Sequence, residues 1–271
     1  MRVWTLHEAI EQCERAVWKG TRGERTAVHN AEQAAQFFGD APLDEITTDR
    51  IDQFIDSLKE AGNTGGTVNR KLAALSKVLS HAHRRSHVSA MPHFEHQTES
   101  AGRVRYLTPE EEDQAVATLT AQGRLDHAEV LVVLVDTGLR PSELWRLEER
   151  DINYVNNTLT VWQPKNSHPR SIPMTRRVVS IMARRKDLVF PYANDWFSYG
   201  WDCMKRQLNL MHDKGFVPYA LRHTCASRLI QRGVPIMVVK EWMGHKTIEI
   251  TVRYAHLSPA NLLEAVKVLE A

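Results

Sequence analysis

A short stretch near the end of the chain constrains its fold and chemistry more than any other part. Tyr219 and Arg222 are three residues apart, so on a helix they share one face, with His223 beside them. An apolar run then ends at a Gly-His pair containing His245, and Tyr254 follows nine residues later. The pattern groups a helical start, a Gly-His corner and a late tyrosine.

These residue types suit an attack on a phosphate group. A tyrosine becomes a nucleophile only if one group removes its proton and another stabilises the charge that forms. An arginine is always cationic, and its planar fork fits two phosphate oxygens. Taken alone, His245 is more often a helix-end or core histidine, and Tyr254 a packing aromatic. The functional interpretation therefore depends on the whole group and on matches elsewhere.

Two further segments complete a family pattern. The late stretch resembles the C-terminal box of the tyrosine recombinases, the phage integrase family, in which H-x-L-R-H, L-G-H and a tyrosine occur in this order. TGLRPSEL at 137–144 resembles the family's first arginine box, and WQPKNSHPRSIPM at 162–174 resembles its lysine hairpin. Three boxes in this order form a specific match, whereas any single one would be weak.

The resemblance implies a role for each matched residue. Tyr254 would be the nucleophile, attacking a DNA phosphodiester to form a 3′-phosphotyrosyl bond and release a 5′-hydroxyl. Arg140 and Arg222 would neutralise the charge on the phosphate, and His245 would join them. Lys165 would protonate the leaving oxygen, although a lone loop lysine is usually just solvated.

Three more residues near the boxes have weaker assignments. Glu143 would support Arg140, or the two could form a surface ion pair worth little. Tyr219 stands where the family usually has a histidine; its phenol can donate a hydrogen bond but stays neutral near pH 7. His223 is interpreted as orienting its neighbours rather than contacting phosphate.

The pattern of apolar and capping residues in the first 90 positions predicts a small bundle of four helices. Thr5 and Glu8 form a capping-box pattern before the first, and the others are expected at 25–38, from Thr48 and from Thr67. One face of the fourth helix and its continuation are basic, which could be an ordinary solvated face. With the resemblance, we interpret this face as DNA-binding, through Arg70, Lys71, Lys77, Arg84 and Arg85.

A metal site is not predicted. Five histidines crowd residues 81–96, but no cysteine is nearby and the spacing crosses a segment containing Pro92. We therefore expect these histidines to face solvent or DNA. Since two arginines would balance the phosphate charge, the mechanism implied by the resemblance needs no metal, ATP or other cofactor.

The fold class expected is mainly α with a small antiparallel β-sheet (α+β), in two domains. Residues 1–90 would form a helical core-binding domain (SAM-like), 91–105 a linker, and 106–271 the catalytic domain. In the catalytic domain, Thr108-Pro109 begins a helix, residues 128–138 form a buried one, and strands lie at 158–163 and from Ser171. A last helix after Ser258 would dock on a neighbouring subunit or cap the core.

Composition limits the alternatives less than the boxes do. Net charge is only +2, three scattered cysteines fit a reducing compartment, and neither a signal peptide nor a membrane span is expected. We expect a cytoplasmic, nucleoid-associated recombinase in a bacterial cell, integrating or excising a phage or other mobile element. Its partners would be double-stranded DNA and a homo-tetramer on that DNA, with an excisionase or host DNA-bending protein as candidate accessory factors.

Other functions stay open from the sequence alone. A type IB topoisomerase uses the same tyrosine chemistry. A non-catalytic DNA-binding regulator would share the helices and basic face, but would not need Arg140, Lys165, Arg222, His245 and Tyr254 together. A decayed recombinase would fit the Tyr219 substitution. Target sequence, direction of recombination and a role in chromosome resolution are not specified by the sequence.

Overall fold

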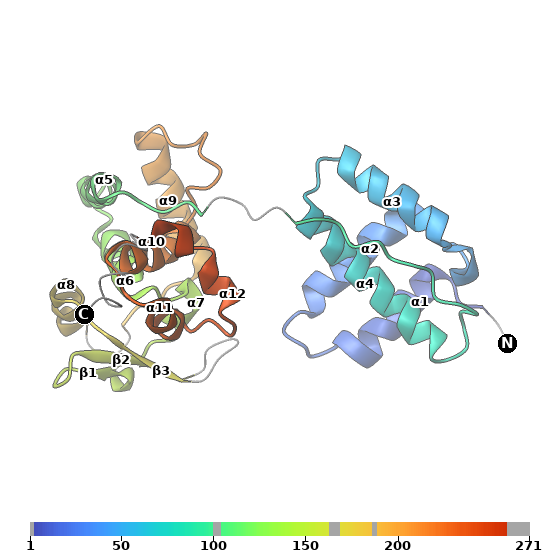
Figure 1. The fold of residues 1–271 in the computed structure, drawn as a ribbon, viewed down its shortest axis with the longest axis horizontal. Helices are drawn as coiled ribbons and strands as arrows, with labels where there is room; N and C mark the ends of the chain where they lie inside the picture. Colours follow the sequence, from blue (N-terminus) through green and yellow to red (C-terminus); the bar gives the residue numbers. More distant parts are fainter. Residues whose placement is uncertain (1–2, 100–103, 163–168, 186–188, 259–271) are drawn as a thin grey trace, which may run out of the picture. The chain divides into compact units, whose positions relative to one another are not determined.

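The computed structural model describes residues 3–99, 104–162, 169–185 and 189–258. The chain divides into two compact units, Met1–Ala101 (the N-terminal unit) and Gly102–Ala271 (the C-terminal unit). Helices dominate both units, and a small antiparallel sheet lies in the second (Figure 1). The predicted α+β fold class is therefore confirmed. In the described residues, no helix is both long and apolar enough to cross a membrane.

The N-terminal unit contains the four predicted helices. The expected capping box at Thr5 and Glu8 is present. The first helix turns into a π-helical segment before its end, and the fourth begins at Gly65, two residues earlier than predicted. The bounds are α1 Leu6–Cys13, the π-helix Glu14–Trp18, α2 Glu24–Phe38, a 3-10 turn Leu43–Glu45, α3 Thr48–Glu60 and α4 Gly65–His83.

Part of the segment predicted as a linker packs on the N-terminal unit. Met91 and Phe94 contact its hydrophobic core, and the Gln97 backbone N–H donates to Asn69 Oδ1 at 2.8 Å. Two apolar side chains in an otherwise polar segment are enough to anchor it. His81 also departs from the expectation of a solvent- or DNA-facing ring, because it is buried and stacks on Trp4.

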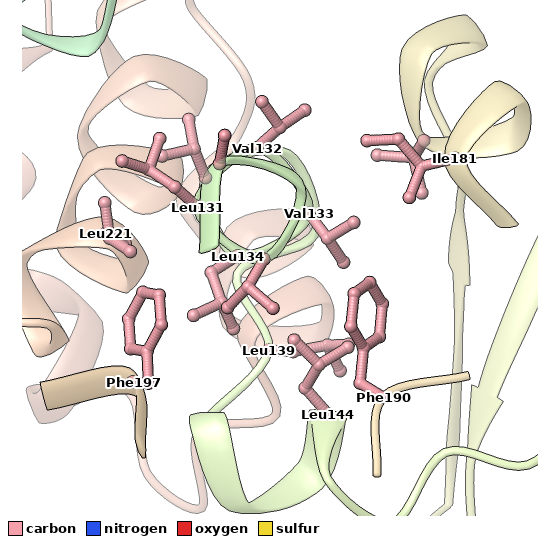
Figure 2. Close-up of a cluster of buried hydrophobic side chains, with 14 of the residues drawn as sticks. Leu131, Val132, Val133, Leu134, Leu139, Leu144, Ile181, Phe190, Phe197 and Leu221 are labelled. Atoms are coloured by element: carbon pink, nitrogen blue, oxygen red, sulfur yellow. The ribbon is translucent and has the colours of Figure 1, made fainter. Parts of the chain in front are cut away.

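The C-terminal unit is built around helix α6. This helix, Leu125–Thr137, is apolar on nearly every side, which is the pattern of a helix enclosed by others. In Figure 2, Leu221, Phe197 and Ile181 lie around it, from three other segments of the chain. Enclosure by several elements fixes the position of its C-terminal end, where Gly138 follows.

The remaining elements of this unit include a small sheet. The three strands pair in the order β1-β2-β3, all antiparallel, with Leu159 opposite Ile172. The bounds are α5 Pro109–Ala121, α7 Pro141–Leu144, a 3-10 turn Glu149–Asp151, β1 Ile152–Asn153, β2 Thr158–Val161, β3 Arg170–Pro173, α8 Arg176–Arg184, α9 Asn194–Gln207, α10 Tyr219–Gln231, α11 Ile236–Met243, α12 Glu249–Val252 and a 3-10 turn Ala255–Leu257.

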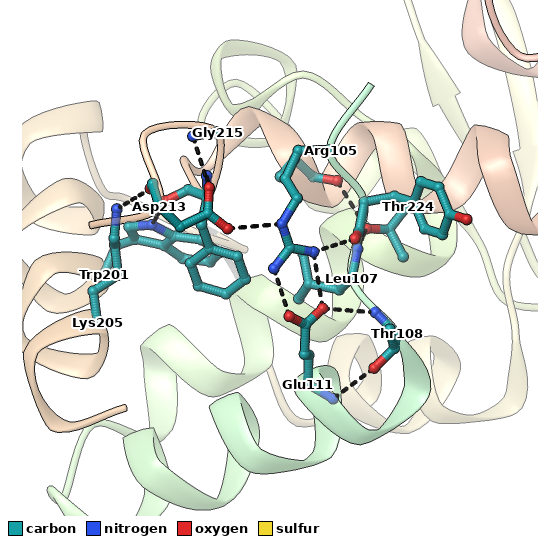
Figure 3. Close-up of polar contacts among 12 residues, drawn as sticks. Arg105, Leu107, Thr108, Glu111, Trp201, Lys205, Asp213, Gly215 and Thr224 are labelled. Carbon is teal, nitrogen blue, oxygen red and sulfur yellow. Dashed lines mark hydrogen bonds and ion pairs between the residues drawn. The ribbon is translucent and has the colours of Figure 1, made fainter. Parts of the chain in front are cut away.

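A polar cluster fixes the start of the C-terminal unit against α10. Arg105 pairs with Glu111 on α5 and donates to Asp213 Oδ2 at 2.9 Å (Figure 3). The Leu107 N–H donates to Thr224 Oγ1 at 2.9 Å, and both residues are buried. Since Thr224 lies on α10, these contacts hold the helix that carries Arg222 and His223.

Candidate active site

Arg222 lies in the first turn of α10 and is 1% exposed. Its two terminal nitrogens donate to the backbone carbonyls of Gly138 and Met243. Both carbonyls belong to helix ends, where the last C=O groups have no partner within the helix. The guanidinium therefore satisfies two orphan acceptors, which fixes the plane of its fork.

Glycines make these two helix ends possible. Gly138 ends α6 and Gly244 ends α11, both in the left-handed region with φ +65° and +61°. A Cβ at Gly138 would lie 2.7 Å from Met243 Sδ, and one at Gly244 would lie 2.9 Å from a terminal nitrogen of Arg170. The left-handed backbone favours glycine at both positions, and a Cβ at either one would also require the neighbouring side chain to shift.

Arg140 precedes α7 and is held by a buried carboxylate. Its Nη1 lies 2.8 Å from Glu143 Oε1, and its Nη2 lies 3.5 Å from the Gly244 carbonyl. The Glu143 side chain is only 5% exposed and binds Arg170 as well, at 2.8 Å. The alternative of a surface ion pair is therefore wrong, because Glu143 bridges two arginines inside the unit.

Arg170 was not among the predicted site residues. Its Nε donates to the Trp242 carbonyl at 3.1 Å, and both terminal nitrogens contact Glu143. The sequence carried one usable signal. Arg170 and Ile172 occupy alternate positions on β3, so an inward-facing Ile172 implies an inward-facing Arg170.

Glu143 remains charged in this setting. Burial alone would raise its pKa, but hydrogen bonds and the charges of Arg170 and Arg140 lower the pKa from 4.5 to about 2. The folded state therefore gains stability from this group above pH 4.5 and loses it as the pH falls toward 2.

Glu143→Gln should lower the free energy of unfolding of the C-terminal unit by about 3 kcal/mol, because a neutral amide leaves two partly buried arginines, Arg140 and Arg170, without a counter-charge. Calorimetry of the whole chain would measure the shift. Glu148→Gln is the matched control, since Glu148 pairs with Arg150 at the surface, and it should change stability by less than about 1 kcal/mol. Equal effects of the two changes would contradict a bridging role for Glu143.

Tyr254 lies beside both site histidines and is 2% exposed. Its hydroxyl is 2.6 Å from His223 Nδ1. Its ring is parallel to the His245 ring, with centroids 6.5 Å apart. The His245 Nδ1 lies 2.8 Å from Thr251 Oγ1 on α12. The structure thus brings Tyr254, His223 and His245 together from three separate segments.

The electrostatics around these groups are strongly positive. Burial, followed by Arg222 and Arg140, lowers the pKa of His245 to about 3. Burial, Arg253 and Arg222 lower the pKa of His223 to about 4. Both rings are neutral at pH 7, so His245 would act on a phosphate as a hydrogen-bond donor. Burial raises the pKa of Tyr254 to about 12, so its phenol is protonated and needs a base.

The other predicted positions have different outcomes. Tyr219 is 45% exposed and its ring lies edge-on to His223, with centroids 5.0 Å apart. Lys165 and the predicted helix after Ser258 lie outside the described residues. No group of three or more His, Cys, Asp or Glu side chains in the described ranges could hold a metal ion.

On α4 and just after it, the predicted basic face is only partly exposed. Lys71 is an exception, because its side chain is buried and its Nζ donates to Asn63 Oδ1 at 3.2 Å. The helical spacing places this position next to the buried Leu72 and Leu75 rather than on the outer side. The other four side chains are exposed, namely Arg70, Lys77, Arg84 and Arg85.

The family model described as "Phage integrase family" matches residues 105–261, more than half of the 271-residue chain. The chain belongs to the phage integrase family. Members of this tyrosine recombinase family cleave and rejoin DNA. The resemblance inferred from the three boxes is therefore confirmed.

Curated relatives in the phage integrase family cover the chain to different extents. A tyrosine recombinase of Thermosipho africanus is 24% identical, over 84% of this chain and 86% of that protein. The integrase of Haemophilus phage HP1 is 31% identical, over 51% of this chain and 39% of that protein. The integrase of Escherichia phage P2 is 27% identical, over 82% of this chain and 64% of that protein. The chain thus spans less than two thirds of either phage integrase.

Solved structures share the fold. The Tn1549 transposon integrase in complex with circular intermediate DNA is similar with a TM-score of 0.80 and 20% identity, over 98% of this chain and 99% of that chain. A lambda integrase dimer bound to a core site gives a TM-score of 0.80 at 17% identity, over 96% of this chain and 79% of that chain. At these identities the likeness concerns the fold alone.

Proposed function

We propose that this phage integrase family member is a site-specific recombinase that cleaves DNA with Tyr254 as nucleophile. The observation that carries the proposal is the convergence of one tyrosine hydroxyl with several arginines in a buried site. Of the nearby charges, Arg222 lowers the pKa of Tyr254 most, and Arg222, Arg140, Arg253 and Arg170 all lower the pKa of His245. Such a field favours an anion with several oxygens, and a phosphodiester fits it.

The cleavage step would be a displacement at phosphorus. The Tyr254 oxygen forms a bond to phosphorus as the bond to the 5′-oxygen breaks, leaving a 3′-phosphotyrosyl ester. Arg140 and Arg222 neutralise the charge that develops on the non-bridging oxygens, and the neutral His245 donates a hydrogen bond to one of them. Lys165 gives the departing oxygen its proton. Because the ester retains the energy of the broken bond, a second DNA end can reverse the step without ATP.

DNA binding by the N-terminal unit is part of the same proposal. Arg70, Lys77, Arg84 and Arg85 are exposed and would contact phosphates, which predicts affinity that falls steeply with salt. Recombination of two sites needs four strand cleavages, so we propose a homo-tetramer on DNA. Exposed apolar side chains on α11 and α12 support docking of a neighbouring subunit's C-terminal segment, namely Met237, Val238, Ile250 and Val252.

We also propose that the DNA element is a phage or other mobile element and that the protein acts at the bacterial nucleoid. An excisionase or host bending protein would then set the direction. A type IB topoisomerase is the competing proposal from the same chemistry. It would relax supercoiled plasmid that lacks any attachment site, whereas a recombinase would act only on plasmid carrying the site.

A nicked suicide DNA carrying the candidate attachment site tests the proposal directly. On a denaturing gel the wild-type chain should give a covalent protein–DNA band in EDTA, because arginines rather than a metal balance the phosphate charge. Loss of the band in EDTA would contradict the metal-independent step. A clear gel shift without any covalent band would favour the DNA-binding regulator or a decayed recombinase.

A further inference from the structure

We propose that His223 is the general base that takes the proton from Tyr254 in the cleavage step. This inference rests on the proposed function, since it names the proton acceptor for the same nucleophile. It also revises the orienting role that the sequence had favoured for His223.

His223 is already in contact with the hydroxyl whose proton it would accept. His223 Nδ1 and Tyr254 Oη are 2.6 Å apart, at the short end for a hydrogen bond between a hydroxyl and a ring nitrogen. A neutral histidine protonated on Nε2 presents its Nδ1 lone pair to the phenol, so Tyr254 O–H donates and His223 accepts. The contact is thus aligned along the path that the proton would take.

The backbone fixes this acceptor beside the phosphate-binding arginine. His223 follows Arg222 directly on α10. The guanidinium of Arg222 donates hydrogen bonds to the carbonyls of Gly138 and Met243. Thr224, the next residue, binds the Leu107 N–H. Base and arginine therefore share one rigid helical turn, and the phosphate bound by Arg222 would approach Tyr254 with its acceptor in place.

Other candidates for the base are less well placed. Among the described residues, the hydrogen bond at Tyr254 Oη is made by His223, whereas the ring of His245 binds Thr251. Tyr219 contacts the ring of His223 and is 45% exposed. It covers His223 from the outer side with an edge-on contact.

The charge state of His223 fits the role. Among the residues that the structure describes, the ring is faced by Tyr219 and Arg222 on its own helix, and by Tyr254 and Arg253 from the segment packed against it. Burial and the two arginines hold its pKa near 4, so the ring is neutral and able to accept at pH 7. An incoming phosphate would offset the charge of Arg222 and raise this pKa, which strengthens the base when substrate is bound.

The proton transfer is balanced and reversible. As the Tyr254 oxygen bonds to phosphorus it loses its basicity, so its proton moves to His223 Nδ1 and the ring becomes an imidazolium. The P–O5′ bond breaks, and Lys165 supplies a proton to that oxygen. In the rejoining step the imidazolium returns its proton to the Tyr254 oxygen as the phosphotyrosyl bond breaks.

Single-turnover cleavage of suicide DNA would test the assignment with two variants, His223→Gln and His223→Ala. Each should slow cleavage by roughly 10²-fold or more while DNA binding persists. The same DNA with a 5′-bridging sulfur at the scissile phosphate distinguishes loss of the general base from loss of the general acid. A thiolate leaves without a proton, so this substrate should rescue Lys165→Ala but neither His223 variant. His212→Ala, which changes an exposed histidine of the same unit, is the control expected to cleave at the wild-type rate.

The pH dependence on the sulfur substrate distinguishes a base from a structural role. Between pH 6 and 9 the wild-type rate should be level, because His223 is already neutral there. The His223→Ala rate should rise about tenfold per pH unit, as hydroxide in solution increasingly supplies the phenolate. Parallel profiles, rescue of His223→Ala by the sulfur leaving group, or wild-type rates in both variants would each overturn the assignment.

A measurement on the wild-type chain covers the case in which the variants fail to fold. Long-range ¹H–¹⁵N spectra of the histidine rings should find His223 protonated on Nε2 with a free Nδ1 lone pair. A proton on Nδ1 would overturn the assignment. If the wild-type chain forms no covalent adduct at all, the proposed function itself fails, which is a distinct outcome from an adduct that forms without help from His223.

Discussion

Tyr254→Phe should abolish covalent cleavage of DNA while leaving DNA binding within about twofold of wild type. The change removes one oxygen, and that oxygen is the atom that would bond to phosphorus. The phenyl ring keeps its place in the core, so the loss of one hydrogen bond to His223 should cost stability only about 1 kcal/mol. Suicide-substrate cleavage and a gel shift on the same preparations would measure both quantities.

Tyr199→Phe provides the matched control for this change. Tyr199 is 61% exposed on α9, and its hydroxyl has no assigned role, so the variant should cleave as the wild type does. A covalent adduct formed by Tyr254→Phe would show that another side chain is the nucleophile.

Arg140→Ala should reduce cleavage by about 10³-fold, because it removes one of two cations aimed at the developing charge. The fold should survive the change, since Glu143 keeps its contacts with Arg170. Binding should weaken much less, and the slope of log affinity against log salt should fall by about 0.9, the value for one phosphate contact. Cleavage rates at saturating protein and a salt titration of the gel shift would give the two numbers.

Arg150→Ala serves as the comparison, because Arg150 is an exposed arginine paired with Glu148 in the same unit. It should leave cleavage unchanged. If Arg140→Ala lost affinity and cleavage in equal measure, Arg140 would be a binding residue rather than a stabiliser of the transition state.

Local sequence signals predicted the elements that position the site. Thr108 and Pro109 mark the start of α5, and Gly138 marks the end of α6, as the structure confirms. These are short-range signals, in which a cap or a left-handed glycine acts within one helical turn. The arginine, histidine and tyrosine positions followed from the boxes that these elements carry.

Contacts across long sequence separations were not predictable in the same way. Arg170 reaches Glu143 on a different element, and Lys71 turns inward to Asn63. The hydrogen bond between His223 and Tyr254 joins residues 31 positions apart. Each depends on how elements pack, which periodicity within one element does not specify. The sequence pattern therefore indicated an orienting role for His223, whereas its contact with the Tyr254 hydroxyl supports the proposed role as proton acceptor.

The central claim is that Tyr254 forms the covalent bond to DNA, and peptide mapping of the trapped adduct tests it most directly. Trypsin should release Tyr254 in the peptide spanning residues 254–267, and mass spectrometry would locate the attached nucleotide. The account predicts a 3′-phosphate ester on the Tyr254 oxygen and a free 5′-hydroxyl on the other DNA fragment. A nucleotide on any other residue, or a 5′-phosphate linkage to Tyr254, would contradict it.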